Sequence, residues 1–287
     1  MVNELFKYMN ERELIRIKKE RGDPKPWTAD PILSTYKFTN VKREDDRTTR
    51  WMRQNWTNPA RGEPLNVQLF NCALFRYFGT VEFAKEVGYQ FDFHPAFIKH
   101  VAEQMLSAGR KVFTGAYVIT NGGIAKPKYQ VVVDEYLTPL WHKSFELAEI
   151  AKMTGSWQKT AEEMRKLPGF GGTGFMTKEV LLDAMQTPVL EDCNDRNTWC
   201  PLGPGARKGL NVVMGREMGK TVPEKQMLEE MIDLFTIAPN FMAPYMPELE
   251  LHDIQFSLCE TSKYTKVKLG IGRPRSLYNG NTDRRMD

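Results

Sequence analysis

The sequence predicts a mostly α fold with two helical lobes and a cleft between them. Apolar residues recur at helical spacing through most of the 287 residues. Capping residues and glycines mark where these periodic segments begin and end. Runs with the alternation of β-strands are few. A cleft between lobes is where a binding site is expected by default.

Composition limits the class of protein. Hydrophobic residues make up 41% and charged residues 26% of the chain, which is typical of a globular protein with a sizeable core. The longest apolar runs are too short to span a membrane, and the N-terminus lacks the apolar stretch of a signal peptide. We therefore expect an intracellular protein. Four scattered cysteines without zinc-ligand spacing predict reduced thiols and no metal site.

Helix signals divide most of the chain. Asn10 with Glu13 forms a capping box, and Gly22 ends that first helix. The further expected helices cover 45–56, 65–78, 95–108, 133–153, 206–214, 224–235 and 251–263. We expect a single unit over 1–287, with an N-terminal helix at 1–22 and lobes at about 25–153 and 154–280.

Strand signals are confined to one place. The runs 112–120 and 129–133 flank a turn at Asn121-Gly122-Gly123 and predict a small hairpin, although the second run is also compatible with the start of a helix.

A glycine-rich turn carries the strongest functional signal. The stretch Leu167-Pro168-Gly169-Phe170-Gly171-Gly172-Thr173-Gly174 joins a helix capped by Ser156 to a second helical pattern. Such a stretch is typical of a helix-hairpin-helix element, whose glycines leave N–H groups open to a DNA phosphate. Contacts of this kind position a protein on the duplex and read no sequence. A plain αα-hairpin with glycines that permit close packing is the equally weighted alternative. The DNA-binding residues of the first interpretation are Gly169, Phe170, Gly171, Gly172 and Thr173.

A charged segment precedes the helix expected at Asp45. Asp45 and Asp46 lie where the helix dipole favours negative charge. Arg43, Arg47 and Arg50 are spaced to share a helix face and to offer guanidinium groups to phosphate. A salt-bridge network with Glu44 and Asp46 is the favoured alternative.

Two loops carry further candidates. Asp192 and Asp195 follow the second helix of the predicted hairpin, where either carboxylate is a candidate general base, with helix capping as the commoner role of a loop aspartate. Gly203-Pro204-Gly205 precedes a helix with two early cations and predicts an anion-binding turn. It lacks the spacing of a P-loop, so nucleotide hydrolysis is not expected.

The last expected helix has polar residues on more than one face. Asp253, Phe256 and Glu260 share one face, and Gln255, Cys259 and Ser262 share another. Buried polar groups need partners, so this helix is expected to line a polar site. His252 is interpreted as structural. The basic residues after it are a candidate contact for a polyanion: Lys263, Lys266, Lys268, Arg273, Arg275, Arg284 and Arg285.

Taken in order, several blocks resemble one enzyme family. They are Pro26-Trp27-Thr28 with Asp30-Pro31-Ile32-Leu33, Phe38-Thr39-Asn40-Val41-Lys42-Arg43-Glu44-Asp45-Asp46-Arg47, Phe113-Thr114-Gly115-Ala116-Tyr117, Leu167-Pro168-Gly169-Phe170-Gly171, Pro201-Leu202-Gly203-Pro204-Gly205-Ala206 and Asp253-Ile254-Gln255-Phe256-Ser257-Leu258-Cys259-Glu260. Together they resemble the α-glutamyl/putrescinyl thymine pyrophosphorylases, or amino acid:DNA transferases, over about residues 25–280. The helical domain of 5-hydroxymethyluracil DNA kinases is similar.

The resemblance implies a fold like that of helix-hairpin-helix DNA glycosylases and a role in bacteriophage thymidine hypermodification, in the cytoplasm of the infected host. Members replace the pyrophosphate of 5-pyrophosphoryloxymethyluracil in DNA with an amine from an amino acid or a polyamine. The implied partners are double-stranded DNA carrying a modified thymine and a small amine. No cofactor is expected, and a divalent metal that bridges the pyrophosphate stays an open alternative for which no residue spacing argues. Bifunctional glycosylases have a lysine just after the hairpin glycines. Gly172-Thr173 stands there in this chain, which puts a Schiff base in doubt.

The residues can be fitted to this chemistry as a hypothesis. The target base is expected to flip out of the duplex, with Tyr117 stacking on it. Cations that tighten on the departing pyrophosphate accelerate the step, and a carboxylate takes a proton from the amine. The expected catalytic residues are Asp192, Asp195 and Asp253. The expected substrate-binding residues are Arg43, Asp46, Arg47, Tyr117, Gln255, Glu260, Lys263, Arg273 and Arg275.

Two alternatives remain at this stage. A monofunctional glycosylase would release a free modified base and leave an abasic site. A DNA-binding module without catalysis would contribute only its hairpin to a larger modification complex.

Overall fold

The computed structural model describes residues 2–272 and residue 274. The regular elements of the described residues are all helices, and these residues contain no β-strand, which confirms the predicted mostly α fold. None of its helices is both long and apolar enough to cross a membrane. Arg273 and Arg275 lie outside the described residues.

The chain forms two compact units. Unit 1 comprises Met1–Asp46 and Asn197–Asp287, and unit 2 comprises Arg47–Arg196. The chain therefore leaves unit 1 after its first helices and returns to it at Asn197, whereas the predicted lobes divide the chain once, near 153. Each unit is described by itself below.

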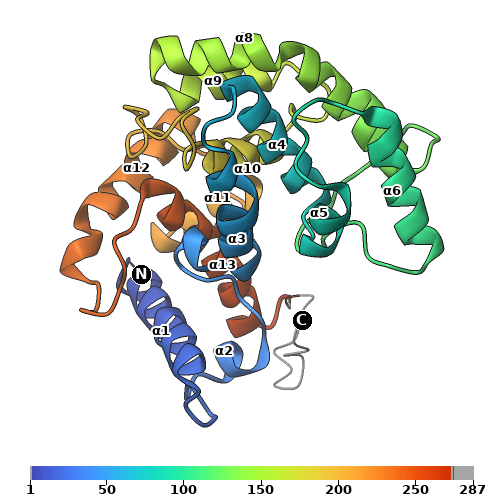
Figure 1. The fold of residues 1–287 in the computed structure, drawn as a ribbon. Coiled ribbons are helices and arrows are strands. Elements are labelled where there is room, and N and C mark those ends of the chain that lie inside the picture. The colour runs from blue at the N-terminus through green and yellow to red at the C-terminus, as the bar shows by residue number, and fades with distance from the viewer. Residues whose placement is uncertain (1, 273, 275–287) are drawn as a thin grey trace. The chain divides into compact units, whose positions relative to one another are not determined.

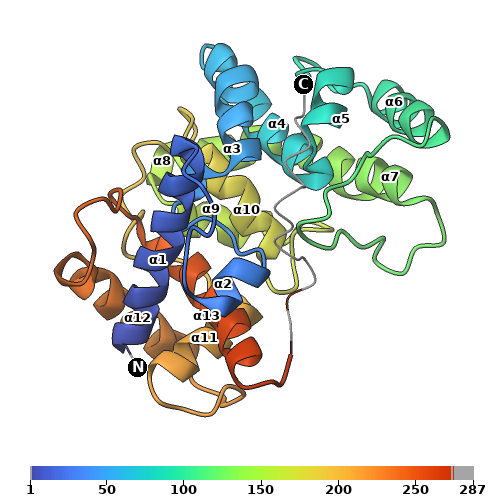
Figure 2. The ribbon, with the colours of Figure 1, turned by 90° about the horizontal axis from the view of Figure 1, so that it is seen from below.

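Unit 1 is built around its last helix. Its helices are α1 (Val2–Arg21), α2 (Pro31–Thr35), α11 (Pro204–Val213), α12 (Glu224–Ile237) and α13 (Leu251–Lys268). Helix α13 packs against all four of the others, and Figure 2 shows α1 and α11 beside it. A Cβ atom at Gly209 would lie 1.9 Å from the carbonyl oxygen of Leu258, so the close approach of α11 to α13 requires glycine at 209.

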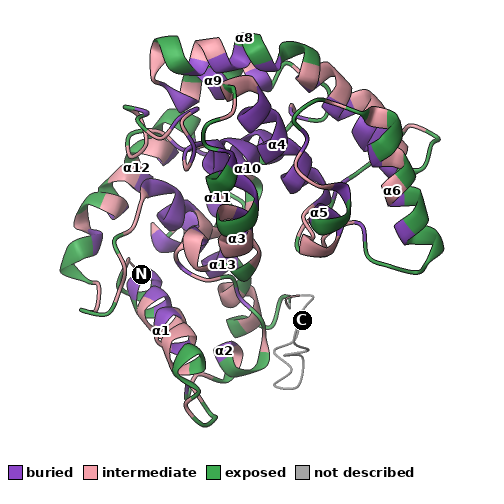
Figure 3. Ribbon diagram, viewed as in Figure 1, coloured by how far each residue is buried: buried purple, intermediate pink, exposed green. Residues whose placement is uncertain are grey.

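Unit 2 has two buried helices at its centre. Its helices are α3 (Arg47–Met52), α4 (Leu65–Phe78), α5 (Val81–Val87), α6 (Pro95–Ser107), α7 (Lys128–Val131), α8 (Thr138–Thr154), α9 (Trp157–Met164) and α10 (Phe175–Ala184). Helix α4 packs against α8 and α10 (Figure 1). Almost every residue of α4 and α10 is buried, as Figure 3 shows. Burial on all sides explains why neither helix has a pronounced polar face in its sequence.

Helix ends with strong local signals lie where the sequence predicts them. Helix α4 ends at Phe78, and Gly79 follows in the left-handed conformation with φ 66°. Ser156 caps α9 because its hydroxyl accepts a hydrogen bond from the backbone N–H of Lys159. Pro95 begins α6, and Glu224 begins α12, as predicted.

Two local predictions are wrong, and one helix start is displaced. The first helix begins at Val2, and Asn10 lies in its middle, where its side chain hydrogen-bonds to the backbone of Phe241 and Ala243. The helix expected at about 45–56 begins two residues later, because a 3-10 turn at Arg43–Asp45 is followed by extended backbone at Asp46 and helical turns then run from Arg47 to Thr57. The predicted strands are absent, because Val112–Thr120 is irregular and 129–133 is helical.

Candidate functional site

The N-terminus of α13 in unit 1 holds a buried carboxyl. Asp253 is 1% exposed, and its two oxygens accept backbone N–H groups of Arg43 and Glu250, each at 3.0 Å. The second bond is half of a capping box, because the Glu250 side chain accepts the N–H of Asp253 in return. Burial raises the pKa of Asp253 to about 7, although the two N–H groups oppose this shift. A carboxyl of this kind can exchange a proton at neutral pH.

The His252 side chain lies close to Asp253, and the Arg43 side chain packs against Phe256 of the same helix. The Arg43 side chain is buried, and its guanidinium carbon lies 5.6 Å from the centre of the Phe256 ring, within the range of a cation–π contact. His252 is also buried, with Nε2 at 3.5 Å from Asp253 and Nδ1 at 3.2 Å from Glu250. Arg43 and Asp253 therefore both belong to unit 1, where the backbone N–H of Arg43 binds the Asp253 carboxyl. A guanidinium can bind an anion, and a carboxyl with a pKa near 7 can accept a proton.

The middle of α13 carries the other predicted polar residues. Gln255 and Glu260 are both buried. Glu260 accepts the backbone N–H of Thr39 at 3.4 Å and forms an ion pair with Lys263 at 2.5 Å. Burial acts to lower the pKa of Lys263, but the charge of Glu260 and its hydrogen bond to Lys263 together raise that pKa. Helix α13 therefore buries polar side chains, as its sequence predicts.

The arginines at 43 and 47 do not share a helix. Arg43 lies in the 3-10 turn of unit 1, and Arg47 is the exposed first residue of α3 in unit 2. Asp46 is exposed between them, and its backbone N–H binds the carbonyl of Arg43. The common guanidinium face expected for Arg43, Arg47 and Arg50 is therefore not formed, because the extended backbone at Asp46 interrupts the helical register.

The loop after α10 caps a helix. Asp195 accepts hydrogen bonds from the Trp157 N–H at 2.9 Å, the Gln158 N–H at 2.9 Å and the Ser156 hydroxyl at 2.6 Å. All three donors lie at the start of α9, so both carboxylate oxygens of Asp195 are used in capping. Asp192 is exposed in the same loop. Asp253 belongs to unit 1, whereas these two aspartates belong to unit 2.

The glycine-rich turn connects α9 to α10 and is tightly packed on one side. Gly169 has φ 82°, and a Cβ atom there would lie 2.5 Å from Tyr136 and from the hydroxyl of Tyr77. The Tyr77 hydroxyl donates to the Gly169 carbonyl at 2.7 Å. Phe170 is fully buried, so its side chain belongs to the core of unit 2. The close packing of the alternative interpretation is thus present at Gly169.

The other side of this turn is open. Gly172 and Thr173 are exposed at its tip, and a Cβ atom at Gly172 would meet nothing within 4 Å. Gly174 precedes the first turn of α10, and no side chain caps that helix. Tyr117 lies beside the end of this turn: its ring centre is 5.2 Å from that of Phe175, the first residue of α10, and its hydroxyl donates to the carbonyl of Arg76.

Unit 2 contains a buried ionic cluster whose residues were not among those predicted from the sequence. Asp183 on α10 is fully buried and forms ion pairs with Arg76, also buried, and with Arg53 at 2.8 Å. Arg76 also donates to the Thr49 hydroxyl at 3.1 Å. A signal was present in the sequence: charged residues interrupt the otherwise apolar segment of α10, and charged groups are rarely buried without a specific partner.

Helix α10 buries two further charged residues. Lys178 lies 3.2 Å from Glu179, and its ammonium group lies 5.5 Å from the centre of the Phe175 ring. Among the described residues, no group of three or more His, Cys, Asp or Glu side chains is arranged to hold a metal ion.

A near match to a phosphate-binding loop occurs between α11 and α12. Gly215-Arg216-Glu217-Met218-Gly219-Lys220-Thr221 is one residue shorter than a P-loop. It follows a helix where a P-loop follows a strand. The Asn211 amide donates to the carbonyls of Met218 and Lys220, at 3.2 and 2.7 Å, and Arg216 forms an ion pair with Glu230. These bonds indicate that the loop is a structural connection between α11 and α12.

Comparison with known proteins identifies the family. Residues 1–271 match the family model described as 5-hmdU DNA kinase, helical domain. The chain is 29% identical over 213 residues to a 5-hmdU DNA kinase of Bacillus phage SP10, an alignment that covers 67% of this chain and 33% of the relative. It therefore spans about one third of that relative's length. No solved structure matches. The match over nearly the whole chain shows that the protein belongs to the family of 5-hmdU DNA kinase helical domains.

Proposed function

We propose that this protein modifies thymine-derived bases in bacteriophage DNA, by displacing pyrophosphate from 5-pyrophosphoryloxymethyluracil with the amine of an amino acid or polyamine. The family match over residues 1–271 carries the proposal, because the relative is named for a hydroxymethylated uracil base in DNA. The proposed partners are double-stranded DNA with a modified base and a small amine. The proposed place of action is the cytoplasm of the infected cell.

The chain offers no basis for assigning the kinase step to it. No strand followed by a phosphate-binding loop occurs in its described part, and the near match at 215–221 is a structural connection. The chain corresponds to one third of the relative, so phosphate transfer in that protein can belong to the other two thirds. A reaction on a base that is already phosphorylated is consistent with this division.

The residues of unit 1 supply the groups that the substitution needs. The amine nitrogen attacks the methylene carbon on C5, the carbon–oxygen bond breaks, and pyrophosphate leaves with the bonding electrons. In the proposal Arg43 stabilises the departing anion, while Asp253 takes the proton that the nitrogen loses. The pKa of Asp253, near 7, suits a group that accepts a proton at neutral pH.

The same proposal gives the hairpin a positioning role. The exposed tip at Gly172 and Thr173 is the part of this turn that is open to a DNA phosphate. The target base would be flipped out of the duplex at a cost of a few kcal/mol, offset by such backbone contacts. Arg47, Asp46 and Lys263 remain proposed substrate contacts, as do Arg273 and Arg275 beyond the described helices.

One experiment tests the reaction. DNA bearing 5-pyrophosphoryloxymethyluracil is incubated with the protein and either glutamate or putrescine, then digested to nucleosides and analysed by mass spectrometry. The transferase yields an amine-substituted nucleoside and free pyrophosphate. Free modified base and abasic sites would establish a glycosylase in its place.

A second candidate function has its own support. The family is that of one domain of a kinase, so a DNA-binding module that serves a separate catalytic protein also fits the match. Unchanged DNA with either amine, together with specific binding to the modified duplex, would favour this function over catalysis.

A further inference from the structure

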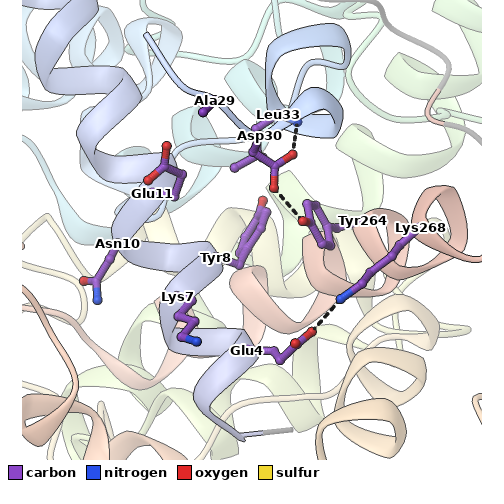
Figure 4. Close-up of a pocket in the computed structure, with 10 residues that line it drawn as sticks. All are labelled: Glu4, Lys7, Tyr8, Asn10, Glu11, Ala29, Asp30, Leu33, Tyr264 and Lys268. Carbon is purple, nitrogen blue, oxygen red and sulfur yellow. Dashed lines mark hydrogen bonds and ion pairs between the residues drawn. The ribbon is translucent and has the colours of Figure 1, made fainter.

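Unit 1 contains a surface pocket away from the residues discussed above. It has a volume of about 560 Å³ and is lined by residues of α1, of the segment before α2 and of the last turns of α13 (Figure 4). Three of its lining residues are carboxylates: Glu4, Glu11 and Asp30. Two tyrosines, Tyr8 and Tyr264, form part of its wall, with ring centres 5.6 Å apart.

The Tyr8 hydroxyl is an unsatisfied polar group in this wall. Tyr8 is 6% exposed, and its hydroxyl has no hydrogen-bond partner among the described residues. Figure 4 shows this hydroxyl at the end of the ring that faces Asp30 and Tyr264. A buried hydroxyl without a partner costs about 1–3 kcal/mol, a cost that a bound donor would remove.

The carboxylates differ in how far the protein already uses them. Glu4 forms an ion pair with Lys268 at 3.0 Å. Asp30 accepts the N–H groups that begin α2 and the Tyr264 hydroxyl at 2.6 Å. Glu11 accepts only the Thr28 hydroxyl and forms no ion pair with any described residue. Neither Glu11 nor Asp30 forms an ion pair with a described residue, although Lys7 and Lys268 also line the pocket.

The negative charges around the pocket act on Tyr264. The pKa of Tyr264 is raised by burial first, then by its hydrogen bond to Asp30 and by the charges of Asp30, Glu4 and Glu11. The same charges that disfavour a phenolate favour a cation in the pocket. Tyrosine rings add to this preference, because their faces attract ammonium groups.

We propose that this pocket binds the primary ammonium group of a small aliphatic amine, held by Glu11, Asp30 and the Tyr8 hydroxyl. Such a group carries three N–H donors for three acceptors. The source of the ammonium is either a diamine or an α-amino acid. Lys7 distinguishes them, because it lines the pocket, forms no ion pair with a described residue, and would bind the carboxylate of an amino acid. The inference does not depend on the reaction proposed above.

Calorimetric titration of the full chain without DNA tests this site. Putrescine and L-glutamate are the two ligands, and 1,4-butanediol is the uncharged control. Saturable binding of at least one amine with no binding of the diol is expected. In the diamine case Lys7→Gln strengthens binding, since it removes a like charge, and in the amino acid case it weakens binding.

Two variants locate the binding. Glu11→Gln is expected to raise the dissociation constant about tenfold, which corresponds to about 1.4 kcal/mol. Tyr8→Phe is expected to weaken binding several-fold without lowering the melting temperature, because the hydroxyl that it removes has no partner in the free protein. Glu20→Gln, on the same helix but outside the pocket, is the matched control and keeps wild-type affinity.

Two results would overturn the inference. The first is the absence of saturable binding of either amine in the millimolar range. The second is binding that neither Glu11→Gln nor Tyr8→Phe changes. Neither result bears on the substitution reaction, which is followed separately through its nucleoside product.

Discussion

Folding raises the pKa of Asp253 and so makes stability depend on pH. Burial raises its pKa from 3.8 to about 7, so between these values the folded protein holds a proton that the unfolded chain has lost. Its contribution to stability is therefore fully present below pH 3.8 and is lost as the pH rises through 7. Asp253→Asn keeps a neutral side chain at every pH. As the pH rises across that range, the free energy of unfolding of this variant should fall less steeply than that of the wild type. The two slopes should differ by up to about 1.4 kcal/mol per pH unit.

Urea unfolding at about pH 5 and about pH 7 measures the difference. Asp192→Asn changes an exposed aspartate and serves as the control, with the pH dependence of the wild type. Equal slopes for Asp253→Asn and the wild type would show that Asp253 ionises in its ordinary range.

Asp183 carries a second prediction at this scale. It is buried between the guanidinium groups of Arg53 and Arg76, so Asp183→Asn removes the negative charge that both of them contact. We expect a loss of about 3–5 kcal/mol in the free energy of unfolding, measured by urea denaturation. Glu146→Gln, which removes an exposed ion pair with Lys143, should cost less than about 1 kcal/mol. A loss of similar size in both variants would contradict the argument.

The contrast between these two aspartates shows what a single sequence can give. The polar face of α13 was visible because Asp253, Gln255 and Glu260 are spaced along one helix. The partners of Asp183 lie 107 and 130 residues away along the chain, and no local pattern connects them. Tertiary contacts alone bring such a cluster together, so spacing could not predict it.

At the scale of elements, Asp195 is expected to act through α9. Asp195→Ala removes three hydrogen bonds from the start of that helix and should lower the free energy of unfolding by about 1–2 kcal/mol. Asp195→Asn keeps acceptor and capping capacity and should cost less. If Asp195 is catalytic, both variants lose the transfer reaction at a temperature where both are folded. If it only caps α9, both keep it.

Some helix ends are set by neighbouring residues in the sequence, and others are set by distant contacts. Those set by local chemistry, such as Gly79 after α4 and Ser156 before α9, lie where the sequence predicts them. Those set by distant contacts do not: Asn10 looked like a cap but binds the loop at Phe241 and Ala243 inside a longer helix. The short apolar run at 129–133 was ambiguous between strand and helix, and burial in unit 2 accommodates the helix.

The turn between α9 and α10 gives a prediction for DNA binding. Thr173 is exposed at its tip, so Thr173→Glu brings a negative charge to the surface proposed to meet a phosphate. Affinity for duplex DNA should fall about tenfold. The free energy of unfolding should change by less than about 0.5 kcal/mol. Ser107→Glu adds the same charge at the exposed end of α6 and should leave affinity unchanged. Equal affinities for both variants, measured by fluorescence anisotropy, would remove the turn from the DNA interface.

At the scale of the whole molecule, the family match covers both units. Residues 1–271 include every helix from α1 to α13, so neither unit alone corresponds to the family's domain. The proposed machinery is likewise divided, with Arg43 and Asp253 in unit 1 and the DNA-binding turn in unit 2. Assays of the reaction therefore require the whole chain, because unit 2 alone lacks the proposed proton acceptor and unit 1 alone lacks the proposed DNA-binding turn.

The charge distribution of the chain makes a prediction about salt. The sequence after α13 contributes Arg273, Arg275, Arg284 and Arg285, against the acidic residues Asp283 and Asp287. Each arginine that neutralises a DNA phosphate releases counterions and adds about 0.9 to the slope of log K against log salt concentration. A chain ending at Gly272 keeps every helix that the structure describes. Its slope should be shallower by about 1–4, and its affinity at low salt should be weaker. Identical slopes for the two chains would show that these arginines do not touch the phosphates, and the basic contribution to DNA binding would then have to come from the helices themselves.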